Sequence, residues 1–175
     1  DMGLRFTTKF ADTSTLEAAA HGGRTRARFS VNAAAVERFE GGTARVRARL
    51  DALRRMAEAG YPVGLTIAPI MPVEHWREEY DALLQDAADA VEHVVDLDLT
   101  VELITHRFTE GSKRVLAQWY PGSRLDMDEA SRSRKLTKFG SVKWVFPRDA
   151  MKALRGALEA AVARRLPGAR ILYWT

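Results

Sequence analysis

Three segments of the sequence predict β-strands that end in small or polar residues. Lys9 ends the first strand, Ser30 and Asn32 end the second, and Ala68 with Pro69 ends the third. In parallel α/β sheets, ligands bind at the carboxyl ends of the strands. We therefore take these strand ends as the first candidates for a binding site.

The side chains at these ends permit more than one interpretation. Lys9 could bind a ligand carboxylate or phosphate, but a lysine at a strand end more commonly reaches solvent, and the sequence alone favours that interpretation. Ser30 and Asn32 could hydrogen-bond a sugar or an amino-acid ligand, while Asn32 is also a good cap for the helix that follows. The residues alone leave both alternatives open.

A basic and aromatic segment, residues 135–146, predicts a β-hairpin with its turn at Gly140-Ser141. Between positions 130 and 148 the chain has six Lys or Arg residues and no acidic one. Lysines contact DNA phosphates, and an aromatic ring can stack on bases or wedge between them. The alternative is an ordinary hairpin whose aromatic side chains pack inward and whose charges form a solvated face.

Two histidines offer weaker signals. His106 follows a predicted strand that contains Glu102, which could support acid–base chemistry, but a loop histidine that binds backbone carbonyls is the more common arrangement. His75 lies at helical spacing from two glutamates, a pattern that often arises by chance. We predict neither a catalytic residue nor a metal ligand in this chain.

The composition excludes several classes of protein. The chain has 175 residues, of which 46% are hydrophobic, enough for one domain with a core. It has no cysteine, which excludes disulfides, thiolate zinc sites and iron–sulfur clusters held by its own thiolates. It has no apolar run of the ~18 residues that a membrane span needs. We expect a cytoplasmic protein without a membrane partner, and the net charge of +4 permits a polyanionic one.

Alternating strand and helix patterns predict an α/β fold up to position 104, and the pattern then becomes irregular. The predicted strands are 4–8, 24–32, 63–67 and 96–104, and the clearest amphipathic helices are 43–59 and 76–91. The later elements are a helix at 113–120, a helical segment at 129–134, the hairpin, a helix at 149–165 and a strand at 171–174. The sequence begins directly in a strand, so we expect it to be the C-terminal part of a longer protein.

Several of these segments together resemble the spore photoproduct lyase family of radical S-adenosylmethionine (SAM) DNA-repair enzymes. The resemblance runs in order over essentially the whole chain. The matching segments are Leu4–Phe10, Gly23–Asn32, Ala59–Ile70, Val101–Thr109 and Arg170–Thr175.

The resemblance implies a partial parallel (β/α) barrel that holds a [4Fe–4S] cluster on a CxxxCxxC loop and cleaves SAM. The resulting 5′-deoxyadenosyl radical abstracts hydrogen from a thymine dimer in DNA. Since the family's cluster loop lies N-terminal to the matched region, we expect this chain alone to be inactive. We predict that residues 1–104 form the second half of the barrel and residues 105–175 a C-terminal α+β extension that binds DNA. A half-barrel exposes an edge strand, through which the fragment could dimerise.

The resemblance also assigns SAM-binding residues. Lys9 matches the lysine that meets the SAM carboxylate, Ser30 matches a serine that contacts SAM, and Ala68 matches a residue near the adenine.

The hairpin of the family, thought to enter the DNA at the lesion, matches residues 138–143. The family pattern has Arg-Tyr where Lys138-Phe139 stand here, so the charge and the ring are kept but the two-pronged grip and the hydroxyl are lost. We predict four DNA-binding residues: Arg134, Lys138, Phe139 and Lys143.

The sequence leaves two alternative functions open. The first is a DNA- or nucleotide-binding module that is not catalytic even in a full-length protein, and a CxxxCxxC motif encoded upstream would argue against it. The second is a radical SAM enzyme with another substrate, which an assay on different thymine dimers would distinguish.

Overall fold

The structure, a computed structural model, describes residues 2–136 and 140–175. No helix in this part of the chain is both long enough and apolar enough to cross a membrane. The elements follow in the order β1 (Leu4–Thr8), α1 (Ser14–Glu17), β2 (Thr25–Val31), α2 (Ala34–Glu37), α3 (Val46–Glu58), β3 (Val63–Ile70), α4 (Trp76–Val91), β4 (Leu99–Thr105), α5 (Glu110–Trp119), the 3-10 helix η1 (Glu129–Ser131), β5 (Ser133–Leu136), β6 (Val142–Val145), α6 (Arg148–Arg165) and β7 (Arg170–Trp174).

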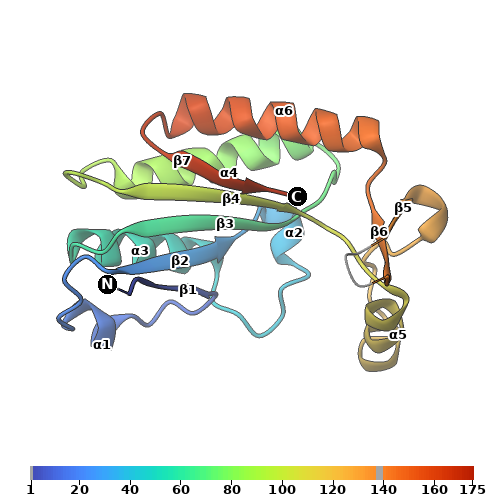
Figure 1. Cartoon of the computed structure of the whole chain (residues 1–175), viewed down its shortest axis with the longest axis horizontal. Coiled ribbons are helices and arrows are strands. Elements are labelled where there is room, and N and C mark those ends of the chain that lie inside the picture. The colour runs from blue at the N-terminus through green and yellow to red at the C-terminus, as the bar shows by residue number, and fades with distance from the viewer. Residues whose placement is uncertain (1, 137–139) are drawn as a thin grey trace.

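Strands β1, β2, β3, β4 and β7 form one sheet in that spatial order, and every neighbouring pair is parallel. Parallel neighbours require crossover connections, which contain the short α1 between β1 and β2 and longer helices between the other pairs. Figure 1 shows α3, α4 and α6 together on one face of the sheet. The predicted α/β architecture is confirmed, and the last predicted strand, 171–174, becomes the edge strand beside β4.

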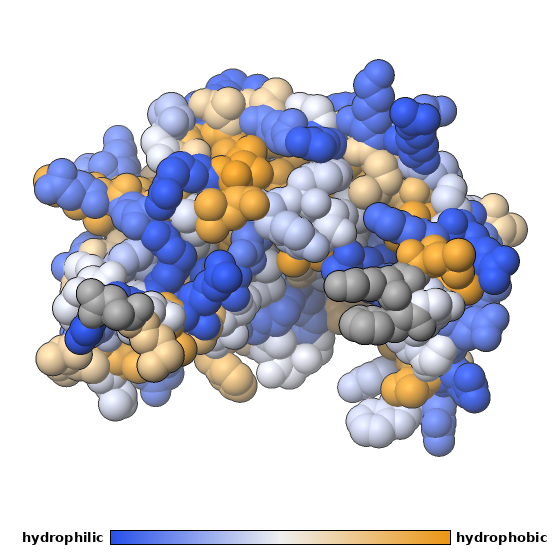
Figure 2. All heavy atoms as spheres, in the orientation of Figure 1, coloured by the Kyte–Doolittle hydropathy of each residue, from blue (hydrophilic) through white to orange (hydrophobic). Residues whose placement is uncertain are grey.

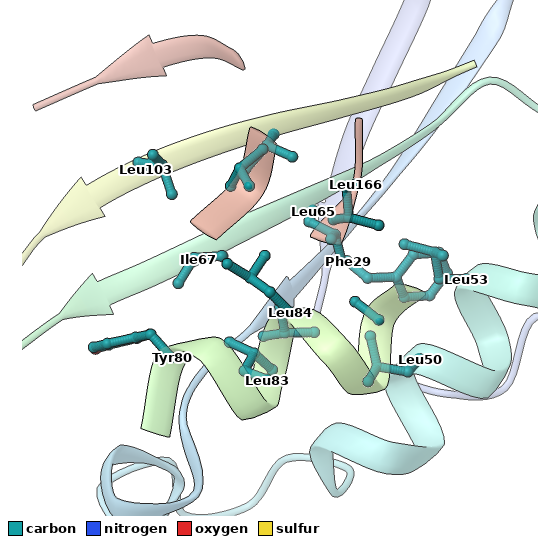
Figure 3. Close-up of a cluster of buried hydrophobic side chains, with 14 of the residues drawn as sticks. Phe29, Leu50, Leu53, Leu65, Ile67, Tyr80, Leu83, Leu84, Leu103 and Leu166 are labelled. Atoms are coloured by element: carbon teal, nitrogen blue, oxygen red, sulfur yellow. The ribbon is translucent and has the colours of Figure 1, made fainter. Parts of the chain in front are cut away.

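The hydrophobic core lies between the sheet and these helices. In β2 the alternate residues Ala27, Phe29 and Val31 are fully buried. Figure 3 shows Phe29 in one cluster with Leu53 of α3 and Leu84 of α4. Burial of each such leucine or phenylalanine side chain stabilises the fold by ~1.5–3 kcal/mol. The period of two along the strands and the apolar stripe along each helix therefore have one cause, burial on a shared face.

The opposite face of the sheet carries polar side chains, and no helix of the described chain covers it (Figure 1). Arg28 of β2, Thr66 of β3 and Glu102 of β4 alternate with the buried hydrophobic residues and meet on this face. Figure 2, in the same orientation, shows hydrophilic side chains over much of it.

A small lobe of α5, η1, β5 and β6 lies beyond the carboxyl ends of the sheet strands (Figure 1). Strands β5 and β6 pair antiparallel, and an isolated bridge joins Phe108 to Trp144. The prediction of a helix over 129–134 is wrong beyond Ser131, because Ser133–Leu136 forms a strand instead. Pairing with β6 overrides the local helical preference of these residues.

Candidate functional site

The three predicted cofactor-binding residues lie on neighbouring strands, at the edge of the sheet formed by the carboxyl ends of the strands. Lys9 directly follows β1, Ser30 is the penultimate residue of β2, and Ala68 lies near the end of β3. Ser30 pairs in register with Thr66, two residues before Ala68. The parallel register therefore brings together residues that are far apart in the sequence.

The ammonium group of Lys9 forms an ion pair at this edge. Its Nζ atom lies 2.5 Å from Oε1 of Glu40. The Lys9 side chain is 32% exposed and the Glu40 side chain only 6%. Because an ammonium group has three donors, Lys9 can keep Glu40 and still donate to a ligand carboxylate. Lys9 therefore combines an ion pair with partial exposure to solvent.

A second cation, Arg49, binds the same glutamate from inside the protein. Its Nη2 atom lies 2.7 Å from Oε2 of Glu40, and its side chain is completely buried. Its Nη1 atom donates to the backbone carbonyl of Ser30 at 2.7 Å. Sequence reasoning missed this residue, although an arginine three positions after Val46 and four before Leu53 stands out within the apolar stripe of a helix.

The side-chain amide of Asn32 is buried and forms hydrogen bonds within the protein. Its Nδ2 atom donates to the carbonyl of Pro69 at 2.9 Å, and its Oδ1 atom accepts from the Ala33 amide and from the Tyr80 hydroxyl. Burial raises the pKa of Tyr80. Asn32 is 1% exposed, so it joins the ends of β2 and β3 and offers no group to a ligand. The alternative interpretation, Asn32 as the cap of the following helix, does not hold either, because α2 has Ala33 as its N-cap.

A half-buried polar pair lies on the uncovered face beneath Ser30. Arg28 Nη1 contacts Glu102 Oε1 at 2.5 Å, and Thr66 donates to Oε2 of the same carboxylate at 3.2 Å. Glu102 is thus bound by these two residues and not by His106, so the acid–base pair that was the less favoured alternative does not form. Arg28 and Glu102 therefore continue the polar surface of the uncovered face from the strand ends toward the middle of the sheet.

His106 lies at the end of β4, under the small lobe. It is 7% exposed, and burial lowers its pKa to about 4, with the nearby Arg132 guanidinium acting in the same direction. Arg132 donates to the His106 carbonyl at 3.4 Å, and its guanidinium carbon lies 3.8 Å from the centre of the Phe146 ring. Arg132 therefore attaches the start of β5 to the edge of the sheet.

The predicted DNA-binding residues fall on β5 and β6 or between them. Arg134 is exposed on β5, and Lys143 is half-buried on β6, opposite Lys135. Lys138 and Phe139 lie outside the described residues. Phe146, by contrast, is 7% exposed, so the inward packing considered for the hairpin aromatics holds for that ring.

The chain does not supply ligands for an iron–sulfur cluster. It has no cysteine, and the described residues contain no group of three or more His, Asp or Glu side chains that could hold a metal ion. The residues present therefore do not fit a [4Fe–4S] cluster.

The fold defines the class: a parallel α/β protein with small and polar residues at the carboxyl ends of neighbouring strands. A family model described as spore photoproduct lyase matches residues 1–175. The chain belongs to the spore photoproduct lyase family.

Individual relatives agree with this assignment. The spore photoproduct lyase of Bacillus subtilis is 42% identical over 177 residues, covering 100% of this chain and 52% of the relative. That of a Geobacillus species is 42% identical over 173 residues, covering 98% and 51%. The chain thus spans about half the length of the curated relatives it matches.

Solved structures of the family have the same fold. A spore photoproduct lyase variant with bound AdoMet and dinucleoside spore photoproduct has a TM-score of 0.93 to this chain, at 40% identity, over 99% of this chain and 51% of the other. A spore photoproduct lyase complexed with dinucleoside spore photoproduct gives 0.93 at 39% identity, over 98% and 51%.

Proposed function

We propose that this chain is part of a radical SAM lyase that repairs spore photoproduct in DNA, and that Lys9, Ser30 and Ala68 contact SAM. The observation that carries this proposal is the meeting of three strand ends at one edge, with an accessible ammonium group among them. The solved relative with bound AdoMet and dinucleoside spore photoproduct supports the choice of ligand and lesion.

Each residue has a distinct role in this proposal. The Lys9 ammonium binds the carboxylate of the methionine part of SAM by a charge-assisted hydrogen bond. The Ser30 hydroxyl, on the uncovered face, donates or accepts one more hydrogen bond. Ala68 leaves room for the adenine, because a larger side chain there would occupy its place. When bound, SAM supplies the 5′-deoxyadenosyl group for hydrogen abstraction from the lesion.

The parallel sheet is, in this proposal, the second half of a partial barrel, and the cluster ligands come from outside this chain. The absence of cysteine and the half-length match to the relatives support this arrangement. The chain alone is then inactive, and the full-length protein acts in the cytoplasm. The exposed edge strand β1, with Leu4 62% exposed, supports dimerisation of the isolated fragment.

Residues 105–175 serve, in this proposal, as the DNA-binding extension of the barrel half formed by residues 1–104. Arg134, Lys138 and Lys143 contact phosphates, and Phe139 reaches the lesion. Two features support this role. The lobe lies at the same end of the molecule as the polar strand ends (Figure 1), and Lys135 stands directly opposite Lys143. Like charges at opposed positions destabilise a strand pair, and a bound polyanion would relieve the repulsion.

The test uses the full-length protein on DNA containing either spore photoproduct or cyclobutane thymine dimers. We expect loss of the spore photoproduct only, and Lys9→Ala should weaken SAM binding. Repair of cyclobutane dimers instead would favour the radical SAM enzyme with another substrate. DNA binding without any SAM binding would favour the non-catalytic module.

A further inference from the structure

We propose that Glu40 is a positioning residue of the SAM site, acting through Lys9. This inference rests on the proposed function, because it concerns how the SAM-binding lysine is held. Glu40 lies in the loop between α2 and α3, outside the strands that carry the proposed ligand contacts.

The backbone of this loop fixes where the glutamate points. The Glu40 amide donates to the Glu37 carbonyl at 2.8 Å, and the Thr43 hydroxyl donates to the Glu40 carbonyl at 2.8 Å. Gly42 follows with a φ of +74°, a conformation that favours glycine. The turn thereby directs the carboxylate inward, where only 6% of the side chain is exposed.

The carboxylate lies between two cations of unequal exposure. Arg49, completely buried, needs a negative partner, because a buried charge without one is costly. Lys9 is the accessible partner on the other side. One carboxylate and two cations leave one net positive charge, and this charge is presented by Lys9 at the sheet edge. That balance matches the single carboxylate of an amino-acid ligand.

The same group of residues also ties the strand ends to each other. Arg49 holds the carbonyl of Ser30, while Glu40 holds the ammonium of Lys9. The ends of β1 and β2 are therefore coupled through the Glu40 carboxylate. Without it, Arg49 would repel Lys9, and the lysine side chain would turn toward solvent.

The test is a double-mutant cycle in the full-length protein, with ligand binding measured by isothermal titration calorimetry. The variants are Glu40→Gln, Lys9→Ala and their combination. The ligands are SAM and 5′-methylthioadenosine, which keeps the adenosyl part but has no amino-acid carboxylate. Glu58→Gln, which removes a carboxylate from an exposed pair with Arg54 on α3, is the matched control.

We expect Glu40→Gln to weaken SAM binding about tenfold and to leave methylthioadenosine binding unchanged. In the Lys9→Ala background, Glu40→Gln should have almost no further effect, because the two residues act as one unit. Glu58→Gln should change neither affinity. Equal losses for both ligands, an undiminished loss in the Lys9→Ala background, or tighter SAM binding would each overturn the proposal.

A second variant shows whether a loss of SAM affinity in Glu40→Gln comes only from misfolding around the unpaired Arg49. Glu40→Asp keeps the negative charge but is one methylene shorter, so it cannot reach both cations. SAM affinity should again fall while the protein stays folded, and an unchanged affinity would contradict a positioning role. If Lys9→Ala itself leaves SAM binding intact, the proposed function of Lys9 fails. If only the Glu40 variants leave SAM binding unchanged, this inference fails alone.

Discussion

The guanidinium of Arg28 reaches across β3 to the carboxylate of Glu102 on β4, with 2.5 Å between Nη1 and Oε1. The intervening residue on β3 is Gly64, which pairs in register with Arg28 on one side and Thr100 on the other. A Cβ atom at Gly64 would lie 3.0 Å from Cγ of Arg28 and 2.8 Å from Oγ1 of Thr100. The ion pair thus depends on a strand position that has no side chain.

The first prediction follows from this close approach. Gly64→Ala should destabilise the protein by about 1–3 kcal/mol, because the added methyl group overpacks a buried site and displaces the Arg28 side chain. Gly156→Ala is the control, since it lies inside α6 with open space around it and should stabilise the helix by up to ~1 kcal/mol. Urea unfolding measures both. Equal stability of the two variants would show that Arg28 can reach Glu102 by another path.

The second prediction concerns pH. Burial lowers the pKa of His106 to about 4, from 6.5 in the unfolded chain, so the unfolded state binds a proton that the native state rejects. Stability should therefore fall as the pH drops from 6.5 toward 4, by about 2 kcal/mol at pH 5 from this residue. His106→Gln cannot titrate, so its free energy of unfolding should change less over pH 6.5–5. The same pH slope for the variant and the parent protein would contradict this account of the buried imidazole.

The third prediction concerns the attachment of the small lobe. Arg132→Lys should cost about 1–3 kcal/mol, because an ammonium group cannot stack on Phe146 and also bind both the His106 carbonyl and Asp126. Hydrogen exchange should accelerate at the β5 and β6 amides more than in the five-stranded sheet. Arg155→Lys, in an exposed helical pair with Glu159, should be nearly neutral. Unchanged exchange in β5 and β6 would exclude Arg132 as their anchor.

The fourth prediction concerns DNA. In the full-length protein, Arg134→Ala with Lys143→Ala should weaken duplex binding and reduce the slope of log K against log salt concentration by about 0.9 for each phosphate that the protein no longer neutralises. Lys152→Ala, an exposed lysine on α6, makes the matched control and should leave the slope unchanged. Fluorescence anisotropy over a salt series measures these slopes. If the double variant keeps the parent slope, β5 and β6 do not bind the phosphates.

The α/β fold and the strands that carry the candidate site are predictable from the order of residues alone. Burial on one face imposes a period of two on strands such as 25–31 and a stripe on helices such as 46–58, so both are visible without coordinates. The order of residues also indicates the family, because ordered segments along the whole chain match it. The strand at 133–136 was not predictable in this way, since its pairing partner on β6 is what makes it extended.

The surroundings of Lys9, by contrast, depend on the complete fold. No local pattern joins Lys9 to Glu40 and Arg49, which come from the loop between α2 and α3 and from α3 itself. Ion pairs form between atoms that the whole fold brings within a few ångströms, and their strength depends on burial that no single segment controls. For the same reason, the path of Arg28 over Gly64 to Glu102 and the burial of His106 beneath Arg132 became visible only once the strands were aligned.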